Sequence, residues 1–196
     1  MIGEKFGHLF DAPLEKFAKR IPVHPNVITI VGFILTVFAS AVLATHMRLG
    51  GGLVLAAGFF DVLDGVVARV NDKKSAFGAF LDSVLDRYSD AFILLAVGWN
   101  LYGSGQPSGL ILSLLTLVGA FLISYTRARA EGLGRECKNG LLERPERVVL
   151  ISVGAMSGLL IIPILWIMAV FTHITALQRI YHVWKVSRER DAVMRG

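Results

Sequence analysis

Long apolar runs constrain the fold of this chain more than any other feature of its sequence. A helix that crosses the hydrocarbon core of a bilayer needs about 20 mostly apolar residues. Six runs approach that length, and short polar or glycine-containing links separate most of them. They are Asn26–Ala44, Gly51–Val70, Ala76–Tyr102, Ser108–Thr126, Glu146–Ile161 and Pro163–Val183. We therefore expect an all-α integral membrane protein with six transmembrane helices.

The composition agrees with a membrane-embedded fold. Hydrophobic residues make up 54% of the 196 residues and charged residues only 18%, so a water-soluble fold of this size would expose a large apolar surface. The single cysteine, Cys137, excludes an internal disulfide framework and a metal site made of cysteines alone.

The first 22 residues differ from the rest of the chain. Five apolar residues between Phe6 and Phe17 can share one face of a helix, which leaves the basic residues from Lys5 to Arg20 mostly on the other face. This pattern is typical of a helix that lies in the membrane interface. We expect residues 1–22 to form a juxtamembrane amphipathic segment and residues 23–196 to form the six-helix membrane domain.

The distribution of basic residues predicts an orientation. Six spans place both termini on one side of the membrane, and nearly all lysines and arginines fall in the segments on that side. Arg48 lies on the opposite side, and Arg87 lies within a span. Cytoplasmic links are enriched in lysine and arginine, so the termini are expected in the cytoplasm, with the bilayer of the cell membrane as the partner. Because the net charge of +5 is explained in this way, we expect no nucleic-acid partner.

Acidic residues interrupt the second and third apolar runs. These are Asp61, Asp64, Asp82, Asp86 and Asp90. A carboxylate at the bilayer centre costs roughly 2.5–3.5 kcal/mol on insertion scales, so four of them without compensation would cost on the order of 10 kcal/mol. The two arginines in these runs are too few to pair with them. We expect bound cations among the carboxylates.

The spacing of these residues places them on two facing helices. Asp61, Asp64, Gly65, Ala68 and Arg69 share one face of an α-helix, and Gly78, Asp82 and Asp86 repeat an i+4 step on the next. The short link over residues 71–75 makes the two helices antiparallel neighbours. Both carboxylate pairs therefore lie near the cytoplasmic end and can face each other.

Hard carboxylate oxygens, with no cysteine or histidine in either run, favour Mg²⁺ or Mn²⁺ over zinc. Two such ions about 3.5–4 Å apart, held by shared carboxylates, are a known arrangement for phosphoryl displacement. We expect such divalent cations among these carboxylates. The alternative, a purely structural network of ion pairs, is disfavoured because like charges at this spacing repel each other.

The motif as a whole reads Asp61-x2-Asp64-Gly65-x2-Ala68-Arg69-x8-Gly78-x3-Asp82-x3-Asp86. It resembles the motif of the CDP-alcohol phosphotransferase family at every fixed position. The resemblance implies that two divalent cations bind here, one to Asp61, Asp64 and Asp82 and the other to Asp61, Asp82 and Asp86. It implies that Asp86 is also the general base toward an acceptor hydroxyl. It further implies that Gly65 and Ala68 lie against the cytidine of a CDP-activated lipid, and that Arg69 and Ser75 contact its diphosphate.

A second group of residues follows the fourth run. The segments from Ser124 to Gly132 and from Gly140 to Arg147, together with Gln178-Arg179, resemble the branch of the family that uses inositol phosphate as the acceptor. In that branch Arg127, Arg144, Arg147 and Arg179 would bind the acceptor phosphate, and arginine suits bidentate phosphate binding. The alternative is that these arginines only set the membrane orientation.

The resemblance implies transfer of a phosphatidyl or archaetidyl group from the CDP-lipid to inositol 1-phosphate, with release of CMP. It also implies a homodimer. Glycerol 3-phosphate as the acceptor or CDP-inositol as the donor would use the same chemistry. A cation transporter remains the alternative from another class, because carboxylates within membrane helices can line an ion path.

Overall fold

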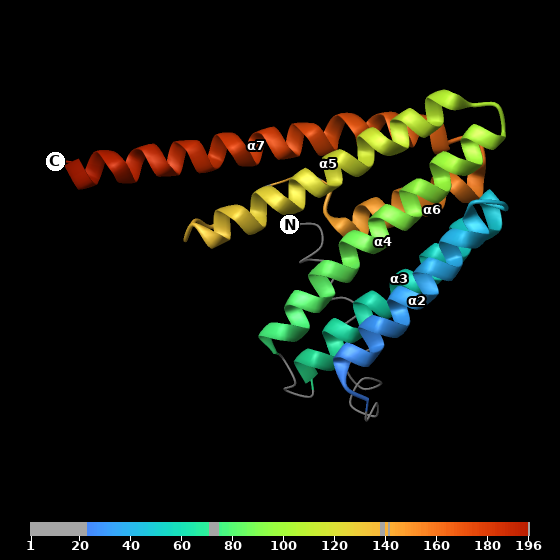
Figure 1. Cartoon of the computed structure of the whole chain (residues 1–196), viewed down its shortest axis with the longest axis horizontal. Helices are drawn as coiled ribbons and strands as arrows, with labels where there is room; N and C mark the ends of the chain where they lie inside the picture. Colours follow the sequence, from blue (N-terminus) through green and yellow to red (C-terminus); the bar gives the residue numbers. More distant parts are fainter. Residues whose placement is uncertain (1–22, 71–74, 138–139, 141, 196) are drawn as a thin grey trace.

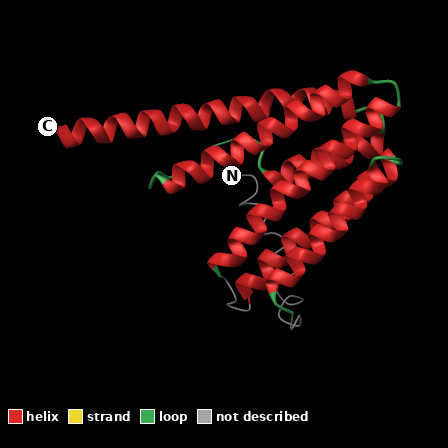
Figure 2. Cartoon of the chain, in the orientation of Figure 1, coloured by secondary structure: helices red, strands yellow, loops and turns green. Residues whose placement is uncertain are grey.

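The computed structural model describes residues 23–70, 75–137, 140 and 142–195, and this part of the chain is helical (Figures 1 and 2). The predicted interfacial segment over residues 1–22 lies outside the described residues. The described helices are α2 (Pro25–Leu43), α3 (Met47–Val70), α4 (Ala76–Gly103), α5 (Pro107–Gly132), α6 (Arg144–Ser157) and α7 (Ile161–Arg195). Each corresponds to one of the six predicted runs, which confirms an all-α fold.

The helix boundaries follow local signals. Ser75 caps the start of α4, where its hydroxyl accepts a hydrogen bond from the backbone N–H of Gly78 at 2.9 Å. Glu143 and Glu146 form a capping box at the start of α6. The break before α7 falls at Gly158, whose φ of 73° favours glycine. The predicted break near Pro163 is thus a few residues late, because proline is tolerated in the first turn of a helix.

Three of the described helices are long and apolar enough to cross a membrane: Pro25–Leu43, Pro107–Gly132 and Ile161–Arg188. Helices α3 and α4 have 24 and 28 residues, but they carry the acidic residues. Helix α6 has only 14 residues, fewer than the roughly 20 needed to span a bilayer core. The structure therefore supports membrane helices, while the count of six spans stays a prediction.

One end of the molecule holds the turns that join α2 to α3, α4 to α5 and α6 to α7 (Figure 1). The main apolar core lies there, with Leu43, Val97 and Leu165 fully or almost fully buried. Asn100 of α4 donates to the carbonyls of Leu43 and Ala44 at 3.2 Å each. This satisfies carbonyls that the end of α2 leaves without helical partners.

The helices spread apart toward the other end. Helices α2, α3 and α4 run together in one direction, while α5 and α7 pack on each other and run in another (Figure 1). Large apolar side chains cover the outside of these helices; Phe38, Trp99, Ile111 and Trp166 are each more than half exposed. Such an outer surface suits contact with lipid.

Candidate functional site

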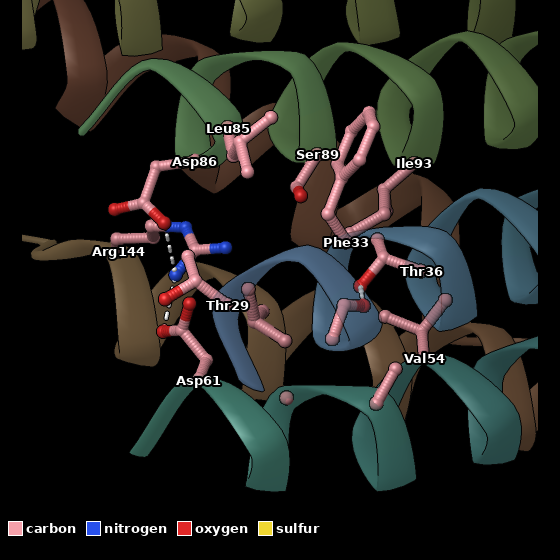
Figure 3. A pocket seen from close by; sticks show the side chains of 14 residues that line it. Thr29, Phe33, Thr36, Val54, Asp61, Leu85, Asp86, Ser89, Ile93 and Arg144 are labelled. Atoms are coloured by element: carbon pink, nitrogen blue, oxygen red, sulfur yellow. Dashed lines mark hydrogen bonds and ion pairs between the residues drawn. The ribbon is translucent and has the colours of Figure 1, made fainter. Parts of the chain in front are cut away.

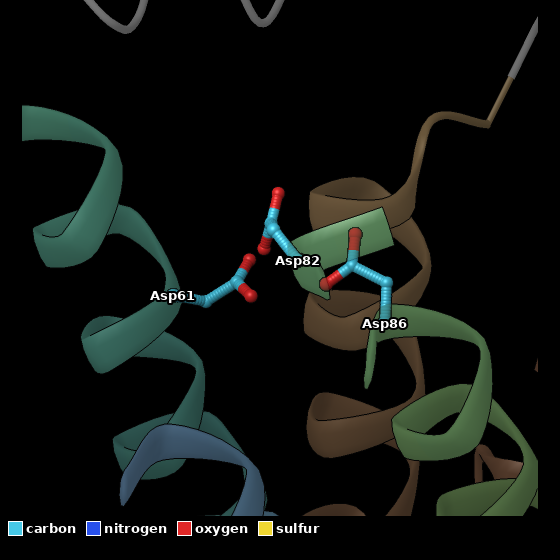
Figure 4. A group of neighbouring side chains, drawn as sticks. All are labelled: Asp61, Asp82 and Asp86. Atoms are coloured by element: carbon cyan, nitrogen blue, oxygen red, sulfur yellow. The ribbon is translucent and has the colours of Figure 1, made fainter. Parts of the chain in front are cut away.

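Helices α3 and α4 bring three of the predicted metal ligands together. Asp61 of α3 points toward Asp82 and Asp86 of α4 (Figure 4). One carboxylate oxygen from each of the three lies within 4.8 Å of the other two. The i+4 spacing puts Asp82 and Asp86 on one face of α4, and the opposing helix supplies the third carboxylate. We call Asp61, Asp82 and Asp86 the carboxylate cluster.

Asp64, the fourth predicted ligand, lies about one turn further along α3. Its residue is only 6% exposed, and its buried Oδ2 atom has no hydrogen-bond partner among the described residues. A buried carboxylate oxygen without a partner is costly. Its burial beside the carboxylate cluster therefore indicates that something else satisfies it in the working protein.

Arg144, at the start of α6, reaches into the carboxylate cluster. Its Nη1 atom contacts Asp61 and lies 2.8 Å from Oδ1 of Asp86 (Figure 3). Its Nε atom is 3.8 Å from Oδ1 of Asp90. The sequence predicts that Arg144 binds an acceptor phosphate, and the structure shows that Arg144 also pairs with two predicted metal ligands.

The chemistry of the carboxylate cluster fits a divalent cation. Its donors are hard oxygens from separate side chains, and oxygens on opposite sides of an octahedral Mg²⁺ are about 4 Å apart at the usual bond length of 2.0–2.1 Å. The three carboxylate oxygens of the cluster lie within 4.8 Å of one another, a separation close to that value. The guanidinium already held between Asp61 and Asp86 shows that this position attracts positive charge.

The residues predicted to bind the CDP-lipid lie where α3 ends and α4 begins. Gly65 and Ala68 are partly buried, and Arg69 is exposed. A Cβ atom added at Gly65 would lie 3.7 Å from Nη1 of Arg69, so the guanidinium lies close to this glycine. A Cβ at Gly78 would approach both Oδ1 of Asn26 and Oγ of Ser75 to 2.9 Å, which explains why α4 carries glycine there.

An open cavity of about 940 Å³ adjoins the carboxylate cluster. Helix α4 lines it on one side and α5 on the other, with the start of α6 and Arg179 of α7. All four predicted phosphate-binding arginines, Arg127, Arg144, Arg147 and Arg179, border this cavity together with Asp86. The structure thus gathers side chains from four helices around one space.

The four arginines differ in how firmly they are held. Arg127 is exposed and pairs with Glu131 at 2.9 Å. Arg179 is 5% exposed and donates to the carbonyl of Ile123 on α5. Arg147 is 3% exposed and donates to the carbonyl of Leu142 at 3.0 Å. The buried arginines therefore have fixed positions, whereas Arg127 lies at the solvent-accessible rim.

Asp90 is a site residue to which sequence analysis gave no role. It is 5% exposed, and its Oδ2 atom accepts a hydrogen bond from Nη2 of Arg147 at 2.7 Å. The sequence does contain a signal, since Asp90 continues the i+4 series from Asp82 and Asp86. Its partner 57 residues later could not be identified from the spacing.

A smaller cavity of about 20 Å³ lies beneath Asp61, Asp86 and Arg144, between α2, α3 and α4 (Figure 3). A cavity of this volume has room for about one water molecule. Thr29, Thr36 and Ser89 supply hydroxyl groups to its wall. This space is too small for a substrate, so the open cavity is the candidate substrate site.

Comparison with known protein families matches residues 22–186 to the CDP-alcohol phosphatidyltransferase model. The chain belongs to this family. The match covers α2 to α6 and α7 as far as residue 186, and it includes every residue of the carboxylate cluster. As a CDP-alcohol phosphatidyltransferase, the protein is a membrane enzyme that transfers substituted phosphate groups.

Two characterised relatives align over most of their length. The archaetidylinositol phosphate synthase of Methanothermobacter thermautotrophicus is 41% identical over 180 residues, which covers 88% of this chain and 89% of the relative. The phosphatidylinositol phosphate synthase of Mycolicibacterium smegmatis is 34% identical over 182 residues, covering 87% of this chain and 82% of the relative.

Crystal structures of the phosphatidylinositol phosphate synthase of Mycobacterium tuberculosis have the same fold. The structure with CDP-DAG bound superposes with a TM-score of 0.79 at 31% identity and covers 89% of this chain and 94% of that one. The structure in complex with manganese and citrate gives a TM-score of 0.75 and covers 89% of each chain.

Proposed function

We propose that this CDP-alcohol phosphatidyltransferase transfers a phosphatidyl or archaetidyl group from a CDP-lipid to inositol 1-phosphate and releases CMP. The observation that carries this proposal is that the carboxylate cluster and the arginine-lined cavity meet at Asp86 and Arg144. An acceptor whose phosphate binds the arginines can present its hydroxyl to Asp86. Relatives of 34% and 41% identity that are named as inositol phosphate lipid synthases support this acceptor class.

Asp61, Asp64, Asp82 and Asp86 are the proposed ligands of two divalent cations, Mg²⁺ or Mn²⁺. Such ions neutralise a diphosphate and the charge that develops on it during displacement. The manganese-bound structure of the M. tuberculosis relative supports this choice of metal. The buried Oδ2 of Asp64, which has no hydrogen-bond partner among the described residues, agrees with a role as a ligand.

The residues of this chain have distinct tasks in the proposed transfer. Gly65 and Ala68 leave room for the cytidine, and Arg69 and Ser75 bind the diphosphate. Asp86 accepts the proton of the acceptor hydroxyl as its oxygen attacks the β-phosphorus. The bond between this phosphorus and the bridging oxygen then breaks, and CMP leaves with the electron pair.

The proposed acceptor site uses Arg127, Arg144, Arg147 and Arg179. Several arginines close to an acidic metal site suit a substrate that brings its own phosphate, because charge-assisted bonds from arginine can be bidentate. An acceptor without a phosphate would make no charge-assisted bonds with these arginines. A phosphorylated alcohol is therefore favoured over a neutral one.

The proposal includes an orientation and an assembly. We propose that the enzyme lies in the cell membrane as a multi-pass homodimer of six-span chains. Its active site faces the cytoplasm, where nucleotide substrates and soluble sugar phosphates occur. The basic links agree with this orientation. A continuous ion path is not supported, since the apolar core closes the opposite end of the bundle in the described residues.

An assay of the purified protein tests the proposal. CDP-lipid, Mn²⁺ and inositol 1-phosphate are expected to yield CMP and a lipid product with the mass of the phosphoinositide. Glycerol 3-phosphate and CDP-inositol serve as the competing substrates. Product from glycerol 3-phosphate and none from inositol 1-phosphate would contradict the proposed acceptor, whereas metal transport without CMP release would contradict the enzyme class.

A further inference from the structure

We propose that Asp90 is a positioning residue that holds Arg144 beside the open cavity when divalent cations occupy the carboxylate cluster. The inference rests on the proposed function, because it concerns the same metal and acceptor sites. In its favour, Arg144 contacts three carboxylates, and only two of them, Asp61 and Asp86, are proposed metal ligands. Asp90 is the third.

Arg144 and a bound cation compete for the same two carboxylates. Nη1 of Arg144 contacts Oδ2 of Asp61 and Oδ1 of Asp86, and Asp61 and Asp86 each provide an oxygen to the carboxylate cluster. A guanidinium has no lone pair for a metal, and its charge repels a cation at this distance. Binding of cations therefore requires Arg144 to release these two carboxylates.

Asp90 is suited to retain Arg144 after that release. Its Oδ1 atom is already 3.8 Å from Nε of Arg144, and that nitrogen is buried without a hydrogen-bond partner in the described residues. Its Oδ2 atom is fixed by Arg147 at 2.7 Å. Arg147 also donates to the carbonyl of Leu142, so the carboxylate of Asp90 is held at the first turn of α6.

The release of Arg144 links the metal site to the acceptor site. Arg144 and Arg147 both line the open cavity, and an Arg144 no longer neutralised by Asp61 and Asp86 can bind a phosphate there. Cation and acceptor phosphate then each favour the state in which Arg144 pairs with Asp90. Such coupling is reciprocal, so each ligand tightens the binding of the other by the same factor.

The test measures Mn²⁺ affinity of the full chain in lipid nanodiscs, from the free Mn²⁺ signal in electron paramagnetic resonance, without substrates. Arg144→Gln is expected to bind Mn²⁺ about 5-fold more tightly or better, and Asp90→Asn about 5-fold more weakly, within the usual range of coupling between sites. The double variant is expected to match Arg144→Gln, because Asp90 acts through Arg144. Equal weakening by Asp90→Asn in both backgrounds would overturn the inference.

A second measurement uses inositol 1-phosphate and, separately, inorganic phosphate. Each is expected to tighten Mn²⁺ binding to the unmodified chain, and Arg144→Gln should lose most of this effect. Arg129→Gln is the matched control, because Arg129 is exposed on the same helix as Arg127 and does not line the cavity. It should leave both the Mn²⁺ affinity and the effect of phosphate on that affinity unchanged. A phosphate effect that persists in Arg144→Gln would contradict the coupling.

Steady-state kinetics separate positioning from a general loss of structure. Asp90→Asn should raise KM for inositol 1-phosphate more than KM for the CDP-lipid. Asp90→Glu keeps the carboxylate and should raise KM for inositol 1-phosphate less than Asp90→Asn does. Equal increases in both KM values would count against the inference. If Asp90→Asn does not fold because Arg147 loses its carboxylate, Asp90→Asn/Arg147→Met removes both charges and allows the Mn²⁺ measurement.

The outcomes distinguish this inference from the proposed function. An unmodified chain that binds no Mn²⁺ would contradict both. A chain that binds Mn²⁺ and releases CMP with inositol 1-phosphate, but shows additive effects of Asp90→Asn and Arg144→Gln, would contradict the inference alone.

Discussion

The two ends of the helix bundle differ in what fills the space between the helices. At the turn end, Leu43, Val97 and Leu165 fill the space between helices with apolar side chains. At the site end, α4 and α5 separate around an open cavity, and the space between α3 and α4 holds carboxylates and arginine. Packing at one end fixes the helices, so that the other end can stay open and highly charged.

The charged side chains at the site end lower the stability of the fold. Like charges at close range repel, and buried polar atoms without partners lower stability. Asp64 and Arg144 both have such atoms among the described residues. Apolar packing at the turn end has to offset this loss of stability. Such compensation is common in proteins whose functional site lowers folding stability.

The largest expected effect comes from removing divalent ions. Chelation with EDTA should abolish CMP release, and Mn²⁺ or Mg²⁺ should restore it, because the carboxylate cluster can neutralise a diphosphate only through a bound cation. Thermal unfolding in detergent should change far less, since the apolar core around Leu43, Val97 and Leu165 is held by packing of apolar side chains. Undiminished turnover in EDTA would contradict a catalytic role for the carboxylate cluster.

Replacing the proposed base is expected to have the next largest effect. Asp86→Asn should lower kcat about 10²–10⁴-fold, the usual contribution of general base catalysis, while CDP-lipid binding is largely retained. Ser113→Ala is the control from the other end of the bundle, because Ser113 is fully buried and its hydroxyl has no partner among the described residues. Initial rates and lipid binding are measured for both variants, and similar loss in Ser113→Ala would break the contrast between the ends.

The turn end should respond in stability instead. Leu165→Ala removes a fully buried side chain and is expected to lower the free energy of unfolding by about 2–5 kcal/mol, as in other well-packed cores. Turnover per folded molecule should stay close to that of the unmodified chain. Thermal denaturation and active-site titration check this, and a selective loss of kcat would mean that packing and catalysis are not separable.

The smallest of these effects concerns the rim of the cavity. Arg127→Gln should raise KM for inositol 1-phosphate roughly 10-fold or more, since a hydrogen bond to a charged group contributes about 1.5–3 kcal/mol. Arg129→Gln is the matched control, because Arg129 is exposed on the same helix and does not line the cavity. Acceptor titrations at saturating CDP-lipid compare them, and an equal rise in both would favour a purely topogenic role for these arginines.

Much of the fold could be predicted because it depends on local patterns. All six helices lie where apolar runs were found, and the facing of Asp61 toward Asp82 and Asp86 followed from helical spacing and a short link. The ends of α6 and α7 were harder, since Glu146–Ile161 was predicted where the helix is Arg144–Ser157. A capping box and one glycine at positive φ set those ends, and the apolar pattern does not record them.

Residues close together in the chain are enough to predict the helices, their membrane character and the convergence of acidic residues. The partners of the arginines depend instead on contacts between distant segments. Arg144 reaches Asp61 across 83 positions and Arg147 reaches Asp90 across 57. These contacts between α6 and the α3–α4 pair depend on how whole helices pack. The spacing of residues within one segment does not specify how helices far apart in the chain pack against each other.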